Sequence, residues 1–112
     1  EAIASYDKAI ASNPTVAKTF YNRGASKANS SDFEGAIEDY NEAIALNDEY
    51  REAYRNRGIA KINLLNRAKA NPAEKLTLEQ TQSACEDFNK AAQLGDKSVD
   101  NEDMLFLYCT KR

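Results

Sequence analysis

The sequence predicts an all-α fold, an α-α superhelix (solenoid) of antiparallel helix pairs that ends in a C-terminal capping helix. The first observation is a repeat: the tripeptide Asn-Arg-Gly at 22–24 recurs at 56–58, and the offset is 56 − 22 = 34. The second is the spacing of apolar residues by three and four positions, which is typical of amphipathic helices. Self-similarity at such a period indicates stacked units that bury their apolar faces against one another. The chain is therefore expected to present a binding surface.

The other half of the period repeats as well. The segment from Ala2 to Ile10 matches the segment from Ala36 to Ile44 at the same offset, and a third copy begins at Ala84. The offset from the second copy to the third is 84 − 36 = 48, so an insertion of 48 − 34 = 14 interrupts the third copy. We therefore divide a single domain into the second half of a repeat (1–16), a full repeat (17–50), a repeat with the insertion (51–98) and a capping helix (99–112).

Turn and capping signals delimit the first helices. Asn13-Pro14 ends a helix over 1–12, because proline disfavours helical backbone at the residue before it. The next helix is expected over 15–29. Ser31-x-x-Glu34 has the pattern of a capping box, which predicts a helix from about Ser31 to Leu46.

The insertion, which we place between 63 and 78, contains Asn71-Pro72 as a turn signal. Two lengthened helices joined by a loop account for it better than one long structureless loop. A second capping-box pattern, Thr77-x-x-Gln80, predicts that the following helix begins near Thr77 and ends before Gly95.

The expected capping helix over 99–112 has charges that suit a helix dipole. Asp100, Glu102 and Asp103 lie near its start, and Lys111 and Arg112 lie at its end. Acidic residues stabilise the first turn and basic residues the last.

These repeats resemble the tetratricopeptide repeat, a helix-turn-helix family with a period of about 34 residues. Several residues match its pattern: aromatic Phe20 and Tyr54, the first-helix glycines Gly24 and Gly58, the second-helix pairs Ala36 with Tyr40 and Ala84 with Phe88, and the closing Pro14. Other positions depart from it, because Arg23 and Arg57 stand where the pattern has leucine. The resemblance implies an architecture and a concave binding face, and it leaves the ligand open.

The concave face that this resemblance implies is lined by residues of the first helices. In the full repeat these are Lys18, Tyr21, Asn22, Ala25 and Asn29, and in the next they are Glu52, Arg55, Asn56, Ile59 and Asn63. Asparagine at equivalent places suits recognition of a peptide backbone, because a carboxamide both donates and accepts. Tyrosine and arginine are residue types that anchor interfaces. An ordinary solvated polar face is the alternative interpretation.

Members of the family that grip a terminal carboxylate use a lysine and an asparagine in one repeat and basic residues in a later one. Here Tyr21 and Ala25 fill the first two of those positions, and Glu52 fills a third. The sequence therefore predicts no carboxylate grip, while Asn22 and Asn56 remain suited to an extended peptide.

Arg23 and Arg57 have two interpretations. Asp39 and Asp87 fall at equivalent positions of the second helices, so each arginine is expected to form a bidentate pair with one of them. Contact with an anionic ligand is the alternative.

Cys85 and Cys109 also leave two possibilities open. They form a disulfide between the last second helix and the capping helix, with an oxidising compartment implied, or they are buried free thiols in a cytoplasmic protein. The localisation therefore stays undetermined.

The composition of the chain limits which classes of function are expected. The net charge is −3, from 15 basic and 18 acidic residues, which argues against nucleic acid or an anionic membrane as partner. The chain has no histidine and two cysteines, so no metal or other cofactor is expected. Adjacent carboxylates such as Glu38, Asp39 and Glu42 are interpreted as a solvated helix face, and no companion nucleophile or phosphate loop accompanies them. We expect no enzyme.

The first helix, over 1–12, corresponds only to the second half of a repeat. Ile3, Tyr6 and Ile10 would then leave part of an apolar face uncovered. We expect either a fragment of a longer array or self-association through this helix.

The sequence therefore favours a non-catalytic scaffold that binds a protein partner, as a peptide or a helix, on its concave face. The alternative is a structural spacer or self-assembly element of a larger protein, with no ligand in the groove.

Overall fold

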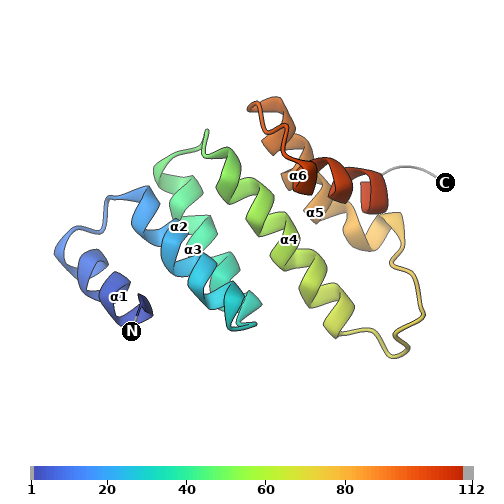
Figure 1. Ribbon diagram of the computed structural model, residues 1–112, viewed down its shortest axis with the longest axis horizontal. Helices are drawn as coiled ribbons and strands as arrows, with labels where there is room; N and C mark the ends of the chain where they lie inside the picture. The colour runs from blue at the N-terminus through green and yellow to red at the C-terminus, as the bar shows by residue number, and fades with distance from the viewer. Residues whose placement is uncertain (1, 110–112) are drawn as a thin grey trace.

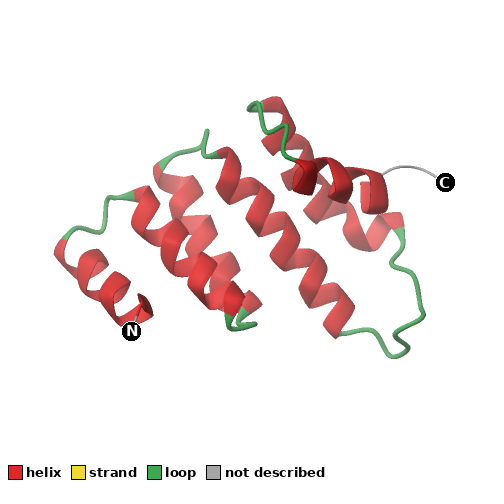
Figure 2. Cartoon of the chain, viewed as in Figure 1, coloured by secondary structure: helices red, strands yellow, loops and turns green. Residues whose placement is uncertain are grey.

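A computed structural model describes residues 2–109 as helices and connecting loops without strands, which confirms the all-α superhelix (Figures 1 and 2). Each helix packs on the next in chain order, giving an array 47 Å long. The elements are α1 (Ala2–Ser12), α2 (Ala17–Asn29), α3 (Phe33–Leu46), α4 (Arg51–Arg67), α5 (Leu78–Gln93), α6 (Val99–Met104) and a π-helical turn η1 (Leu105–Cys109).

Glycine allows the two helices of a repeat to approach closely. A Cβ on Gly24 of α2 would lie 2.9 Å from Cε1 of Tyr40, and one on Gly58 of α4 would lie 2.7 Å from Cε1 of Phe88. Tyr40 and Phe88 are at most 1% exposed, so neither ring has room to move away. The glycines cost about 1 kcal/mol each in helix propensity, and close ring packing offsets that cost.

The buried apolar side chains form two clusters along the array. The first surrounds Phe20, Ala43 and Ala53 at the junction of α2, α3 and α4. The second surrounds Ile62, Ala84 and Phe88 and is covered by the capping segment. Each cluster draws on neighbouring elements, so a repeat is completed by the next one.

The α2–α3 turn corrects one sequence prediction. Ser31 does not cap α3, because it adopts a left-handed backbone (φ 66°) that ends α2. The Asp32 N–H donates to the Lys27 carbonyl at 2.8 Å, which is the long bond of a Schellman motif. Asp32 is instead the N-cap, and its carboxylate accepts from the Gly35 N–H at 3.0 Å.

The second predicted capping box is confirmed. Thr77 accepts from the Gln80 N–H, and the Gln80 side chain accepts from the Thr77 N–H. The α5 helix ends at Gln93, and Gly95 then takes a positive φ of 100°.

The insertion lengthens both helices around a loop, as expected. The α4 helix has 17 residues where α2 has 13, and the loop over 68–77 replaces the short turn over 30–32. Figure 1 shows this loop projecting beyond the ends of α4 and α5.

The capping segment is not one regular helix. Its short α-helix, α6, gives way to the π-helical turn, a change that apolar periodicity does not reveal. Cys109 at the end of this turn is disulfide-bonded to Cys85 of α5, with their Cα atoms 5.6 Å apart. The expected helix end at Lys111 and Arg112 lies outside the described residues, as does Glu1.

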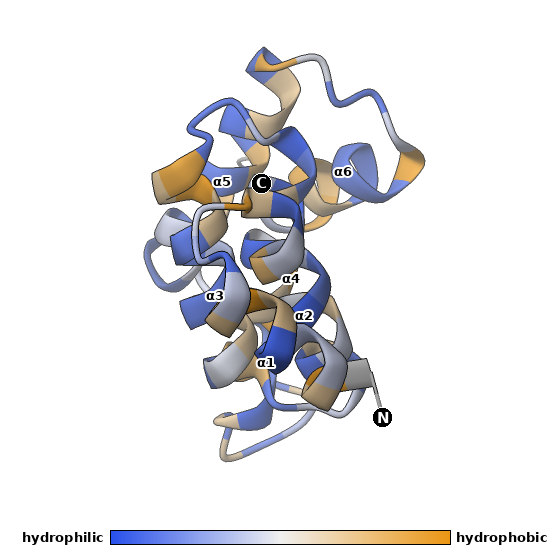
Figure 3. Ribbon diagram, turned by 90° about the vertical axis from the view of Figure 1, so that its left-hand side faces the viewer, coloured by the Kyte–Doolittle hydropathy of each residue, from blue (hydrophilic) through white to orange (hydrophobic). Residues whose placement is uncertain are grey.

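The α1 helix packs on one side only. Ile10 joins the first apolar cluster, while Ile3 and Tyr6 stay half-buried. Figure 3, which views the array from this end, shows hydrophobic and hydrophilic residues interspersed along the helices. Self-association through this helix stays a prediction.

Candidate functional site

A hollow of about 240 Å³ lies between α2, α3 and α4. Five of the residues predicted on the concave face line it: Ala25, Asn29, Asn56, Ile59 and Asn63. Its other lining residues, which the sequence did not indicate, are Ala28, Phe33, Tyr40 and Ala60. The hollow therefore has an apolar floor with carboxamides around it. The repeat offset relates Ala25 to Ile59 and Asn29 to Asn63 on successive first helices.

Tyr21 and Asn56 join the two first helices beside this hollow. The Asn56 side-chain amide donates to the Tyr21 hydroxyl oxygen at 2.9 Å. The Tyr21 ring lies between two others, with centroids 5.8 Å from Tyr40 and 5.0 Å from Tyr50. A carboxamide has two N–H donors and an oxygen with two lone pairs, so Asn56 keeps hydrogen-bonding capacity for a ligand.

Burial makes ionisation of these tyrosines, which are already neutral at pH 7 in water, still less favourable. Loss of solvation raises the pKa of Tyr21, and it raises the pKa values of Tyr40 and Tyr50 to about 12, with the neighbouring Tyr21 adding to both. Each hydroxyl therefore keeps its proton at neutral pH. The site offers neutral donors and acceptors.

The remaining predicted residues lie outside the hollow's lining. Lys18 is exposed and Asn22 is half-buried, both on α2. Glu52 pairs with its chain neighbour Arg51 at 3.7 Å.

Arg55 contacts the turn before the capping segment. Its Nη1 atom lies 2.9 Å from Oδ2 of Asp96, in the turn between α5 and α6, and Asp96 is 6% exposed. Desolvation alone would raise the pKa of Asp96, but hydrogen bonds from Ser98 together with Arg55 outweigh it and lower the pKa. Arg55 therefore attaches the capping turn to α4.

Arg23 and Arg57 form the predicted bidentate pairs. Arg23 Nε and Nη2 donate to Asp39 at 2.9 and 2.7 Å, and Arg57 donates to Asp87 at 2.9 and 2.6 Å. Each aspartate is 3% exposed, so the interpretation of Asp39 as part of a solvated helix face is wrong. The hydrogen bonds with Asp39 raise the pKa of Arg23 further. These arginines are occupied within the protein.

The same arginines also join adjacent repeats. Arg23 Nη1 donates to Asp7 of α1 at 2.7 Å, and Arg57 Nη1 donates to Asn41 of α3 at 2.8 Å. Asp7 and Asn41 are equivalent positions, since 41 − 7 = 34. Each arginine replaces the leucine of the family pattern with a polar link between neighbouring helix pairs.

Neither metal-binding nor membrane-spanning features occur in the described part of the chain. No group of three or more potential metal-ligating side chains is found there. No helix within 2–109 has the length and hydropathy of a membrane span.

The stacked helix pairs define a helical-repeat protein. A sequence model of the Tetratricopeptide repeat family matches residues 17–50, which confirms the resemblance over that segment. A search of curated proteins gave no match.

Solved tetratricopeptide-repeat domains share the fold. The first such domain of Spaghetti (RPAP3), bound to the HSP90 peptide SRMEEVD, is 26% identical with a TM-score of 0.75, over 93% of this chain and 71% of that chain. The second such domain of human RPAP3, solved by NMR with the HSP70 peptide SGPTIEEVD, is 24% identical with a TM-score of 0.76. That match covers 97% of this chain and 79% of the other.

Proposed function

We propose that this protein is a non-catalytic interaction scaffold that binds an extended peptide segment of a partner protein over the hollow between α2, α3 and α4. The observation that carries this proposal is the pairing of Asn56 with Tyr21 beside an apolar floor. The remaining N–H and the oxygen of the Asn56 amide pair with peptide backbone groups, and the carboxamides of Asn29 and Asn63 pair with others. Apolar side chains of the peptide pack against Ile59.

The charge of the site favours a ligand read mainly through its backbone. Both similar domains are solved with peptides that end in the sequence EEVD. In this chain Arg55 is already paired with Asp96, so it is less available to an acidic peptide than an unpaired arginine. We therefore expect weaker binding of strongly acidic peptides than of neutral ones.

A peptide selection with matched variants tests the proposal. Short peptides are selected from a display library on the 112-residue chain, and their affinities are measured by fluorescence anisotropy. Asn56→Ala should weaken neutral binders about ten-fold, since one or two backbone hydrogen bonds are lost. Asn89→Ala, which removes an exposed carboxamide from α5, should leave their affinity unchanged.

Circular dichroism melts show whether each variant keeps its fold. Selected peptides whose affinity is insensitive to Asn56→Ala and to Tyr21→Phe would contradict binding at this hollow. A failure to select any peptide that depends on these residues would favour the spacer alternative.

A further inference from the structure

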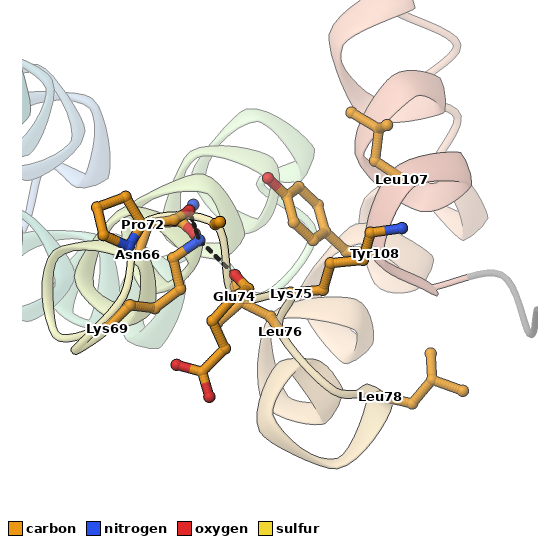
Figure 4. A pocket seen from close by; sticks show the side chains of 10 residues that line it. Asn66, Lys69, Pro72, Glu74, Lys75, Leu76, Leu78, Leu107 and Tyr108 are labelled. Atoms are coloured by element: carbon orange, nitrogen blue, oxygen red, sulfur yellow. Dashed lines mark hydrogen bonds between the residues drawn. The ribbon is translucent and has the colours of Figure 1, made fainter.

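The insertion builds a second hollow, of about 440 Å³, whose lining begins at Asn66, one helical turn beyond Asn63 of the first (Figure 4). Eight of its ten lining residues fall between 66 and 78, and the other two, Leu107 and Tyr108, belong to η1. The inserted segment extends α4, forms most of the loop and lengthens the start of α5. The uninterrupted repeat over 17–50 therefore has no counterpart of this hollow.

Internal bonds shape the loop wall of the hollow. The Lys69 ammonium donates to the carbonyls of Pro72 at 3.2 Å and Glu74 at 2.7 Å. The Asn71 side chain accepts from the Ala73 N–H at 3.0 Å, and Leu76 packs against the second apolar cluster. Figure 4 shows these two hydrogen bonds, which connect the Lys69 ammonium group to the loop backbone. The loop wall is thus formed before any ligand binds.

The opposite wall is fixed by the capping segment. Tyr108 precedes Cys109, whose disulfide to Cys85 attaches η1 to α5. The Tyr108 carbonyl also accepts from the Thr81 hydroxyl at 3.1 Å. Two walls that are distant in the sequence therefore face each other across a fixed gap.

The hollow combines apolar surface with one available positive charge. Leu76, Leu107 and the Tyr108 ring supply the apolar part. In Figure 4 the Lys75 side chain extends toward Tyr108, while the Glu74 carboxylate points away. Lys75 has no salt bridge within residues 2–109, whereas Lys69 is held by the loop carbonyls.

We propose that this hollow is a docking site for a short acidic and apolar peptide segment of a protein partner, separate from the site between α2, α3 and α4. A large apolar side chain packs among Leu76, Leu107 and Tyr108, and an adjacent aspartate or glutamate pairs with Lys75. Leu78 and Leu107 are 46% and 50% exposed, so part of the lining of the hollow faces solvent. A hollow that is open to solvent can accommodate a peptide that extends beyond it, whereas small-molecule sites enclose most of their ligand.

The display selection described above also tests this site. Among peptides selected on the 112-residue chain, we expect a group with phenylalanine, leucine or isoleucine next to aspartate or glutamate. Lys75→Glu and Leu107→Ser should each weaken this group about ten-fold. Lys8→Glu, the same charge change at an exposed position on α1, should not, and neither should Asn56→Ala.

Amide chemical shifts locate the bound peptide. Peptides of this group should perturb residues 69–76 and 107–108, whereas neutral binders should perturb residues 25–29 of α2 and 56–63 of α4. The proposal is overturned if no acidic and apolar group is selected, if Lys8→Glu weakens it as much as Lys75→Glu, or if its shifts lie at the first hollow. Different substitutions test the two sites, so evidence against one proposed site is distinguishable from evidence against the other.

Discussion

Replacing Asp39 by alanine tests whether the arginine pairs hold the array together. Asp39 accepts two hydrogen bonds from Arg23 and lies 3.2 Å from the Lys27 ammonium, and its side chain is 4% exposed. Truncation leaves the Arg23 guanidinium, which is 20% exposed, without its main partner. Breaking a buried pair from one side costs about 3–5 kcal/mol. Because Arg23 keeps Asp7, we expect the lower end, about 3 kcal/mol.

The chain provides a matched control for this experiment. Asp7 bonds to the same guanidinium at 2.7 Å but is 56% exposed, so Asp7→Ala should cost less than about 1 kcal/mol. At roughly 4 °C per kcal/mol for a domain of this size, Asp39→Ala should lower the Tm by about 12 °C, against a few degrees for Asp7→Ala. Circular dichroism melts at neutral pH measure both.

Two results would refute this reasoning. Equal decreases in Tm for Asp39→Ala and Asp7→Ala would show that burial of the carboxylate does not determine the stability of the pair. An unchanged melt for Asp39→Ala together with lost peptide binding would instead assign Arg23 and Asp39 to a ligand site.

Three further predictions concern stability. Gly58→Ala should lower the free energy of unfolding by about 1–3 kcal/mol despite the better helix propensity of alanine, because the added Cβ would contact the buried Phe88 ring. A denaturation midpoint that is unchanged or higher would contradict this. Reduction of the Cys85–Cys109 disulfide, which closes a loop with a sequence separation of 24, should cost about 3 kcal/mol in the loop-entropy model, and melts with and without reductant measure it. Asp96→Asn should lower the free energy of unfolding at neutral pH. The difference from the unsubstituted protein should shrink below about pH 4, because the lowered pKa of Asp96 gives stability that is lost as the carboxylate protonates. A difference that does not change with pH would exclude that cause.

The repeat itself could be predicted because it depends on short-range periodicity. Apolar spacing and a constant offset specify which faces meet, so the pairs of Arg23 with Asp39 and of Arg57 with Asp87 followed from equivalent positions. The Thr77 cap could be predicted for the same reason, since its partner Gln80 lies within one helical turn. Part of the lining of the first hollow followed from the family resemblance, which indicates which face of the first helices lines the concave side.

Other features depend on segments that meet only in three dimensions. Arg55 pairs with Asp96 across a sequence separation of 41, so this contact could not be predicted from the pattern of its own helix. Ser31 fits a capping pattern, yet the end of α2 imposes a left-handed backbone on it, and Asp32 takes the role instead.

The sequence alone determined that this protein is a stack of helix pairs, because each pair must bury an apolar stripe that recurs with the period of the repeat. Only the tertiary structure decided where the insertion and the capping turn meet, because that junction lies outside the repeat and no periodicity constrains it. The second hollow forms at this junction. One side is a loop stabilised by the hydrogen bonds of Lys69, and the other is a turn attached by the disulfide of Cys109.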